Sequence, residues 1–150
     1  MIEAYLAELG IPEEERTLVN GSGLSREASF SPYLLASVIR DMVRHPSVGS
    51  EFQTSLAIAG LDGTLRKRFT DEQVWMRGKT GSLEGVQALA GLVRDGAGHP
   101  YAFAFLVNAH EGTPGLPRQA QDRFVQWVFS QHKVKQEPGS VEEKNENRVD

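Results

Sequence analysis

Residues 74–107 read VWMRGKTGSLEGVQALAGLVRDGAGHPYAFAFLV, and this stretch decides the fold. Its apolar, β-branched and aromatic residues predict three strands, at residues 74–76, 86–93 and 101–107. The Asp-Gly-Ala-Gly sequence at residues 95–98 is a hairpin turn signal between the last two strands. Connections this short leave no room for a crossover helix, so we expect the strands to pair antiparallel. The stretch therefore predicts a meander of about three antiparallel strands.

Helices are predicted before and after this meander in the sequence, which makes the fold class α+β. They are expected at about residues 2–9, 32–45, 51–56 and 118–131. Ser31 and Pro32 suit the cap and the first position of the second helix, and His45-Pro46 ends it. The inner face of the last helix is expected to carry Ala120, Phe124, Trp127 and Val128.

Composition and length fit one ordinary globular domain. The chain has 150 residues, 39% of them hydrophobic and 24% charged, and its formal net charge is −4. The absence of cysteine excludes a disulfide framework, a thiolate zinc site, an iron–sulfur cluster and a cysteine nucleophile. The mild acidity disfavours general binding of nucleic acid. No apolar run reaches the roughly 18 residues that a membrane span needs.

The N-terminus of the chain lacks a targeting signal, and its C-terminus is polar. Residues 1–6 have no basic n-region followed by an apolar h-region, so they do not form a signal peptide. Residues 133–150 are polar and without periodicity, which predicts a disordered tail. We therefore divide the chain into a folded part at residues 1–132 and a tail at residues 133–150.

The most informative short motif is Gly-Lys-Thr-Gly-Ser at residues 78–82, for which two functional interpretations compete. A phosphate-binding loop needs a glycine five positions before the Gly-Lys pair, and that position is Gln73. It also needs a helix directly afterwards, whereas residues 83–86 lead into a predicted strand. The nucleotide-binding interpretation fails on both spacing and context.

The second interpretation places Lys-Thr-Gly on a strand beside an acyl-transfer site. At adjacent positions of an edge strand, the Lys79 ammonium and the Thr80 hydroxyl can hold a substrate carboxylate. Gly81 would let a substrate backbone approach the strand closely. The backbone N–H of Ser82 could donate to a developing oxyanion. The structural alternative is a solvated lysine beside a turn.

Several further blocks follow one another in a specific order. They are Asn-Gly-Ser-Gly-Leu-Ser-Arg at 20–26, Ser-Pro at 31–32, Ala-Gly-Leu-Asp-Gly-Thr-Leu at 59–65, Arg-Gly-Lys-Thr-Gly-Ser-Leu-Glu-Gly-Val at 77–86 and Leu-Ala-Gly at 89–91. As a set they resemble the low-molecular-mass penicillin-binding proteins of the D-alanyl-D-alanine carboxypeptidase/endopeptidase type, the serine peptidase group that includes penicillin-binding protein 4. The resemblance implies the C-terminal part of the penicillin-binding, β-lactamase-like transpeptidase fold.

The chain departs from that family in its catalytic elements. The family's Ser-x-x-Lys nucleophile and Ser-x-Asn element precede these blocks, and neither occurs here ahead of Lys79. Ser130-Gln131-His132-Lys133 spells Ser-x-x-Lys, but it follows Lys-Thr-Gly and is interpreted as a chance match. Asn20 also stands where the family has Asp. We therefore interpret the chain as a C-terminal segment that lacks its N-terminal half.

The resemblance implies a serine-type D-Ala-D-Ala carboxypeptidase or endopeptidase that acts on peptidoglycan stem peptides through an acyl-enzyme. Lys79, Thr80, Gly81 and the Ser82 amide would be its substrate-binding residues, with Lys79 and that amide also taking part in catalysis. β-Lactams would bind to the complete enzyme, no cofactor or metal is implied, and the expected location is the periplasm or cell envelope. The alternative is a non-catalytic remnant or module, in which residues 101–107 pair with a separate N-terminal half.

Other reactive residue types have structural interpretations. Ser22 lies between two glycines, but a nucleophile elbow needs glycine at position 20. Ser25 and Arg26 could shape a cleft or simply bond within their loop. His45 and His99 precede prolines in turns, and His110-Glu111 has no second histidine at helical spacing. Trp75 and Trp127 are expected in the core or a cleft wall.

Overall fold

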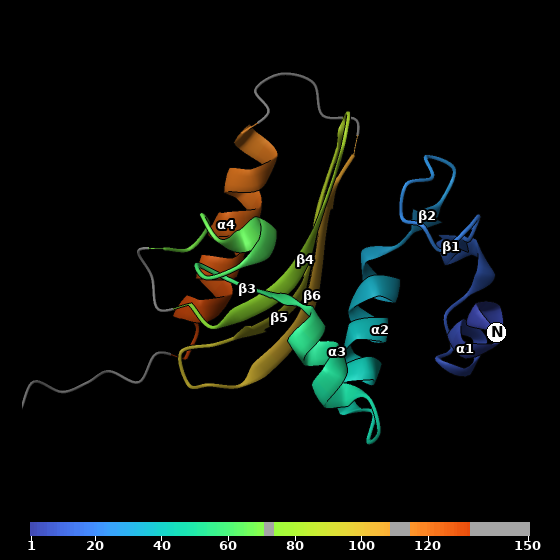
Figure 1. The fold of residues 1–150 in the computed structure, drawn as a ribbon, viewed down its shortest axis with the longest axis horizontal. Coiled ribbons are helices and arrows are strands. Elements are labelled where there is room, and N and C mark those ends of the chain that lie inside the picture. The colour runs from blue at the N-terminus through green and yellow to red at the C-terminus, as the bar shows by residue number, and fades with distance from the viewer. Residues whose placement is uncertain (71–73, 109–114, 133–150) are drawn as a thin grey trace, which may run out of the picture.

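The computed structural model describes residues 1–70, 74–108 and 115–132, and within them a four-stranded antiparallel sheet lies between two layers of helices (Figure 1). The strand order is β3-β4-β5-β6, formed by Ala57–Ile58, Met76–Leu83, Val86–Arg94 and Pro100–Val107. One face of the sheet carries α4, and the other carries α2 and α3, at Gly115–Ser130, Pro32–Arg44 and Gly49–Ser55. In the described parts of the chain, no helix has the length and apolar character to cross a bilayer.

The N-terminal segment packs on the side of α2 that faces away from the sheet (Figure 1). It comprises α1, η1, β1 and β2, at Ile2–Glu8, Glu13–Glu15, Arg16–Thr17 and Ser29–Phe30. Leu6, Ile11 and Leu34 form the buried cluster between this segment and α2. The Tyr5 hydroxyl donates a 2.8 Å hydrogen bond to Asp41, and burial together with this bond raises the pKa of Tyr5 to about 12.

Helix α2 begins and ends where the sequence predicts. The Ser31 hydroxyl accepts a 2.9 Å hydrogen bond from the Leu34 amide, and Pro32 is the first helical residue. The helix ends at Arg44 because a residue that precedes proline, here His45, avoids helical geometry. On its sheet side, Ile39 packs with Leu56 and Leu92. Helix α2 is therefore apolar on both sides.

Successive side chains along each strand of the sheet point to opposite faces, as strand geometry requires. Met76, Leu89 and Phe103 face α4 and form the main core with Val125. Leu92, one residue from Val93 of that core, faces α2 instead. Glycines Gly78 and Gly91 lie opposite each other in β4 and β5, so the two strands approach closely there.

The strand predictions are confirmed for the two later strands and wrong for the first. The expected strand at residues 74–76 starts at Met76 and continues to Leu83, so Lys-Thr-Gly lies in its middle. The short strand β3 and the two-stranded sheet β1-β2 were not expected. Each of these strands has only two residues, which is too few for a periodic sequence signal.

The last helix exists as predicted, but its inner face was assigned incorrectly. Trp127 is 60% exposed and Ala120 is exposed, whereas Gln121 and Val125 are buried. Phe124 and Val128 do pack against the core. At the inner position of Gln121, the side-chain oxygen accepts a hydrogen bond from Arg68. The predicted tail at residues 133–150 lies outside the described residues.

Candidate functional site

Strand β4 carries the Lys-Thr-Gly motif, and most of its outer edge is open. β3 pairs with β4 only at Arg77 and Gly78. In an antiparallel ladder, the backbone groups of successive residues point to opposite sides of the strand. The Met76 carbonyl accepts from Ala59 on the β3 side, so the backbone groups of Thr80 and Ser82 point to that same side. Among the described residues, no strand pairs with them there.

Lys79 is exposed, and its ammonium lies at this open edge. Its Nζ donates a 2.7 Å hydrogen bond to the Thr80 carbonyl, one of the outward-pointing backbone groups. The same edge carries the amide of Ser82, the expected donor to an oxyanion. The edge thus offers a cation close to backbone donors and acceptors with which no described strand pairs, an arrangement that suits an extended peptide with a terminal carboxylate.

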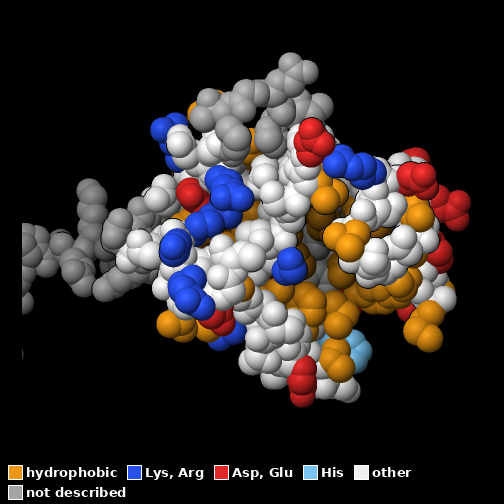
Figure 2. Space-filling view, turned by 45° about the horizontal axis from the view of Figure 1, so that its top comes forward, with side chains coloured by type: hydrophobic (Ala, Val, Ile, Leu, Met, Phe, Trp, Pro, Cys, Tyr) orange, Lys and Arg blue, Asp and Glu red, His pale blue; other side chains and the backbone are white. Residues whose placement is uncertain are grey.

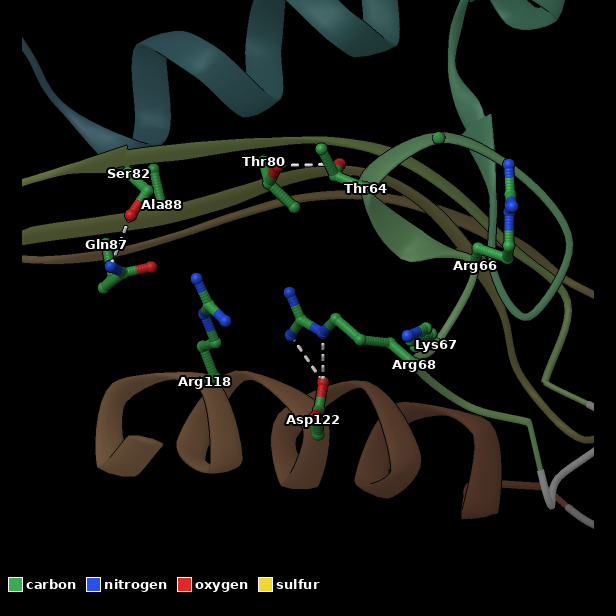
Figure 3. Close-up of a pocket in the computed structure, with 11 residues that line it drawn as sticks. Thr64, Arg66, Lys67, Arg68, Thr80, Ser82, Gln87, Ala88, Arg118 and Asp122 are labelled. Atoms are coloured by element: carbon green, nitrogen blue, oxygen red, sulfur yellow. Dashed lines mark hydrogen bonds and ion pairs between the residues drawn. The ribbon is translucent and has the colours of Figure 1, made fainter. Parts of the chain in front are cut away.

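The side chain of Thr80 points away from that of Lys79. Adjacent residues of a strand face opposite sides of the sheet, and the Thr80 hydroxyl donates a 2.8 Å hydrogen bond to the hydroxyl of Thr64 on the α4 side (Figure 3). The Ser82 hydroxyl accepts a 2.7 Å hydrogen bond from Gln87 on the same side. The structure therefore brings Lys79 to the Thr80 backbone and turns the Thr80 hydroxyl to a different partner.

Gly81 keeps the middle of the strand free of side-chain bulk. A Cβ built there would lie 3.2 Å from the Cβ of Ala88 on β5, which is a tight contact. Because Gly81 has no side chain, the face of β4 that carries Lys79 stays open between residues 79 and 83.

The segment at residues 59–65 delivers Thr64 to β4. The chain turns at Gly60 and Gly63, which have positive φ values of 71° and 50°. The Asp62 carboxylate accepts from the Ile58 amide and closes the turn. The following 3-10 helix η2 (Gly63–Leu65) buries Leu65 completely. The sequence marks this block by resemblance and by Asp62-Gly63 as a turn signal, and in the structure the block supports Thr80 on the α4 side.

The loop at residues 20–26 bonds mainly within itself. The Asn20 side-chain oxygen accepts from the amide and hydroxyl of Ser22, at 2.9 and 2.6 Å. The Ser25 hydroxyl accepts from the Glu27 amide at 3.2 Å. Among the described residues, no lysine or histidine contacts either hydroxyl, so neither is paired with a base. Arg26 approaches the exposed Glu84 side chain, with 3.8 Å between their charged atoms, which brings the loop near the tip of β4.

A buried carboxylate that sequence reasoning treated only as a turn residue organises the far end of the sheet. Asp95 accepts 2.9 Å hydrogen bonds from the amides of Ala97 and His99, and its other oxygen contacts the rings of His99 and His132 and the Tyr101 hydroxyl. Burial favours the neutral form, but the hydrogen bonds from His99 and Ala97 outweigh it and lower the pKa of Asp95 far below its usual range.

Histidines do not form a metal centre in the described parts of the chain, where no group of three or more acidic, histidine or cysteine residues could hold an ion. The His45 ring accepts from the Ser47 amide at 3.3 Å, at the surface. His110, Glu111 and Lys133 lie outside the described residues, as does Gln73. Ser130 donates to the Trp127 carbonyl at the end of α4, which is a local helix contact.

A pocket of about 580 Å³ lies between β4, β5 and α4, on the opposite face of the sheet from α2 (Figure 3). Thr80 and Ser82 line it from the sheet, Arg118 and Asp122 from α4. Arg68 crosses the pocket and donates a 2.8 Å hydrogen bond from Nε to Asp122. Lys79 does not line this pocket, so the strand has a different environment on each face.

Comparison with known proteins gives one consistent result. The family model for D-Ala-D-Ala carboxypeptidase 3 (S13) matches residues 1–131. The carboxypeptidase DacB of Mycolicibacterium smegmatis is 36% identical over 110 residues, which are 69% of this chain and 24% of that protein. The D-alanyl-D-alanine carboxypeptidase DacB of Haemophilus influenzae is 32% identical over 113 residues, 73% of this chain and 23% of that protein.

A solved structure agrees with the sequence relatives. Penicillin-binding protein 4 (DacB) from Haemophilus influenzae matches 85% of this chain and 30% of its own, with a TM-score of 0.71 and 26% identity. A second structure of that protein, in complex with a β-lactam, matches with a TM-score of 0.70 and 27% identity over 83% of this chain and 31% of its own. The chain thus spans roughly a quarter to a third of the length of these relatives.

Proposed function

The chain belongs to the D-Ala-D-Ala carboxypeptidase 3 (S13) family, and from that membership we propose that it forms the Lys-Thr-Gly half of a serine peptidase site that cleaves peptidoglycan stem peptides. The observation that carries the proposal is the open edge of β4 beyond Gly78, where the Lys79 ammonium accompanies the backbone groups of Thr80 and Ser82. A peptide can add to such an edge as a further antiparallel strand.

In the proposed reaction, a serine attacks the carbonyl of the terminal D-Ala-D-Ala bond, the terminal D-Ala leaves, and water hydrolyses the acyl-enzyme. Lys79 binds the terminal carboxylate, with the Thr80 hydroxyl turning from Thr64 toward the edge. The Ser82 amide donates to the oxyanion, an interaction worth about 3 kcal/mol in the transition state. Because this sequence has no Ser-x-x-Lys ahead of Lys79, we propose that the serine comes from another segment of the protein.

The same reasoning assigns the proposed partners and location. Peptidoglycan stem peptides are the proposed substrates, β-lactams the proposed inhibitors of the complete enzyme, and the cell envelope or periplasm the proposed location. The relatives named above are carboxypeptidases, and one of them has been solved with a β-lactam.

A binding measurement tests the carboxylate site directly. We expect a peptide that ends in D-Ala-D-Ala to shift the NMR resonances of the Thr80 and Ser82 amides, and Lys79→Ala to weaken binding about tenfold, since it removes a hydrogen bond to a charged group. Arg40→Ala is the matched control, because Arg40 is an exposed cation on α2. The same peptide with a C-terminal amide should bind no better to the wild type than to Lys79→Ala. Binding that is indifferent to the carboxylate and to Lys79 contradicts the proposal.

A second function, a module that pairs with a separate polypeptide, is supported by β6. This strand pairs with β5 on one side, and no described residue pairs with its other edge. Tyr101, on β6, is 43% exposed. Such an edge is a template for another strand. Analytical ultracentrifugation and a thermal melt together distinguish the two cases. A chain that sediments as a monomer and melts cooperatively by itself argues against an obligate pairing module.

A further inference from the structure

The pocket between β4, β5 and α4 is strongly cationic although the chain as a whole is acidic. Four basic side chains, those of Arg66, Lys67, Arg68 and Arg118, line it, and Asp122 is the carboxylate that lines it with them. The formal net charge of the complete chain is −4. In the view of Figure 2, several Lys and Arg side chains lie near one another on one part of the surface, with a few acidic side chains beside them. A concave wall of one sign concentrates ions of the opposite sign.

The carboxylate in the pocket is already engaged. Asp122 accepts from Arg68 at 2.8 Å, and the two side chains are 31% and 13% exposed. The guanidinium of Arg118 lines the same pocket and points from α4 toward the strands (Figure 3). Among the described residues, no ion pair joins Arg118 to a carboxylate. Asp122 therefore neutralises Arg68, while Arg118 has no ion-pair partner among the described residues, and an anion in the pocket would be attracted to it.

Neutral donors complete the lining on the sheet side. The hydroxyls of Thr80 and Ser82 and the amide of Gln87 lie across the pocket from Arg118 (Figure 3). Hydroxyl and guanidinium donors around one space are the groups that bind phosphate and carboxylate oxygens. The pocket volume of about 580 Å³ falls within the range of small-molecule sites, which is roughly 300–1,000 Å³.

We propose that this pocket binds a small molecule that carries at least two oxyanion groups, with Arg118 as its principal contact. Arg66 and Lys67 hold the second anionic group at the pocket's outer rim, where both are exposed. The pocket lies on the opposite face of β4 from Lys79, and the Thr80 hydroxyl, which lines it in this structure, is the group that it shares with the proposed carboxylate site. Phosphate and carboxylate groups share this chemistry.

Calorimetric titration of the full chain with pyrophosphate and with citrate tests the proposal. We expect saturable 1:1 binding of at least one of them, weakened about tenfold by Arg118→Ala. Arg123→Ala is the matched control, because Arg123 is an exposed arginine on the same helix that does not line the pocket. Its dissociation constant should stay within about twofold of the wild type, whereas a loss of nonspecific attraction alone would affect both variants equally.

The outcomes separate cleanly. Tighter binding of pyrophosphate assigns a phosphate ligand, and tighter binding of citrate assigns a polycarboxylate. Circular dichroism of each variant checks that it is folded, and Lys67→Ala serves as a second probe with the same expected direction if Arg118→Ala unfolds. No saturation with either anion at about 10 mM, or equal weakening in Arg118→Ala and Arg123→Ala, overturns the proposal.

Discussion

Two charged residues, Lys79 and Asp95, have opposite environments: the first is exposed and the second is buried. Lys79 is exposed, and the structure shows its ammonium donating to the carbonyl of the next residue. An ammonium has three N–H donors, so the others are available to a ligand. The side chain of Asp95 is completely buried, and both of its oxygens are bonded within the fold. Sequence reasoning identified Lys79 from its neighbours in the motif. It missed the role of Asp95 because Asp-Gly is a common turn signal, and one of the contacts of this carboxylate, His132, lies at the distant end of α4.

Asp95→Asn is expected to lower the melting temperature by several degrees at pH 7. The folded state lowers the pKa of Asp95 relative to its unfolded value of about 4. The stabilisation is therefore complete above about pH 4 and is lost as the pH falls below that toward the folded-state pKa. Thermal melts between pH 7 and pH 2 should show a flatter acid limb for the variant.

The control for this experiment is Glu8→Gln, which neutralises an exposed carboxylate on α1. It should leave both the melting temperature at neutral pH and the acid limb close to those of the wild type. If Asp95→Asn follows the wild-type curve at every pH, the carboxylate does not hold β5, β6 and α4 together as described.

For helices and strands, the sequence predicts those elements whose boundaries depend on residues within or next to the element. The boundaries of α2 follow from a cap, a proline at the start and a proline after the end. Strands β5 and β6 follow from apolar runs separated by a turn. Strand β4 was misplaced because Arg-Gly-Lys-Thr-Gly-Ser has little apolar alternation, so its conformation depends on pairing with β5. That dependence belongs to the tertiary structure and leaves no local signal.

The pairing of β4 with β5 predicts a severe effect of Gly91→Ala. A Cβ at Gly91 would overlap the Arg77 carbonyl oxygen and lie 2.6 Å from the Cα of Gly78, and both are backbone atoms. Relief requires the strands to separate, so we expect a loss of about 3 kcal/mol or more in the free energy of unfolding, measured by urea denaturation. Gly21→Ala is the control, because a Cβ at Gly21 would meet no atom within 4 Å and the φ of this residue is not positive. Equal stability of the two variants would contradict the close approach.

For the whole molecule, the sheet separates two chemical environments. The α2 side carries Lys79 near the open edge of β4, and the α4 side carries the cationic pocket. The family relationship could be recognised from ordered sequence blocks, and three of these blocks form β4 and the segments that contact it. The pocket could not be predicted from sequence, because Arg118 and residues 66–68 meet only through the packing of α4 on the sheet.

We expect the 150-residue chain alone to form no covalent adduct with a fluorescent penicillin. None of its described serine hydroxyls contacts a lysine or histidine, and no Ser-x-x-Lys precedes Lys79. Gel fluorescence and intact mass spectrometry measure the adduct, with the complete Haemophilus influenzae relative as positive control. Labelling at Ser22, Ser25 or Ser130 would show that the nucleophile lies within this chain.

The alternation along β4 also restricts how the strand can vary in length. Even-numbered residues from Met76 to Ser82 direct side chains toward α4, and odd-numbered residues direct theirs toward α2. Removing one residue between Met76 and Lys79 would exchange the two sets, placing the lysine among the arginines and the threonine on the opposite surface. A substitution in this strand changes one surface at one position, whereas an insertion or deletion of a single codon would reverse both surfaces at once.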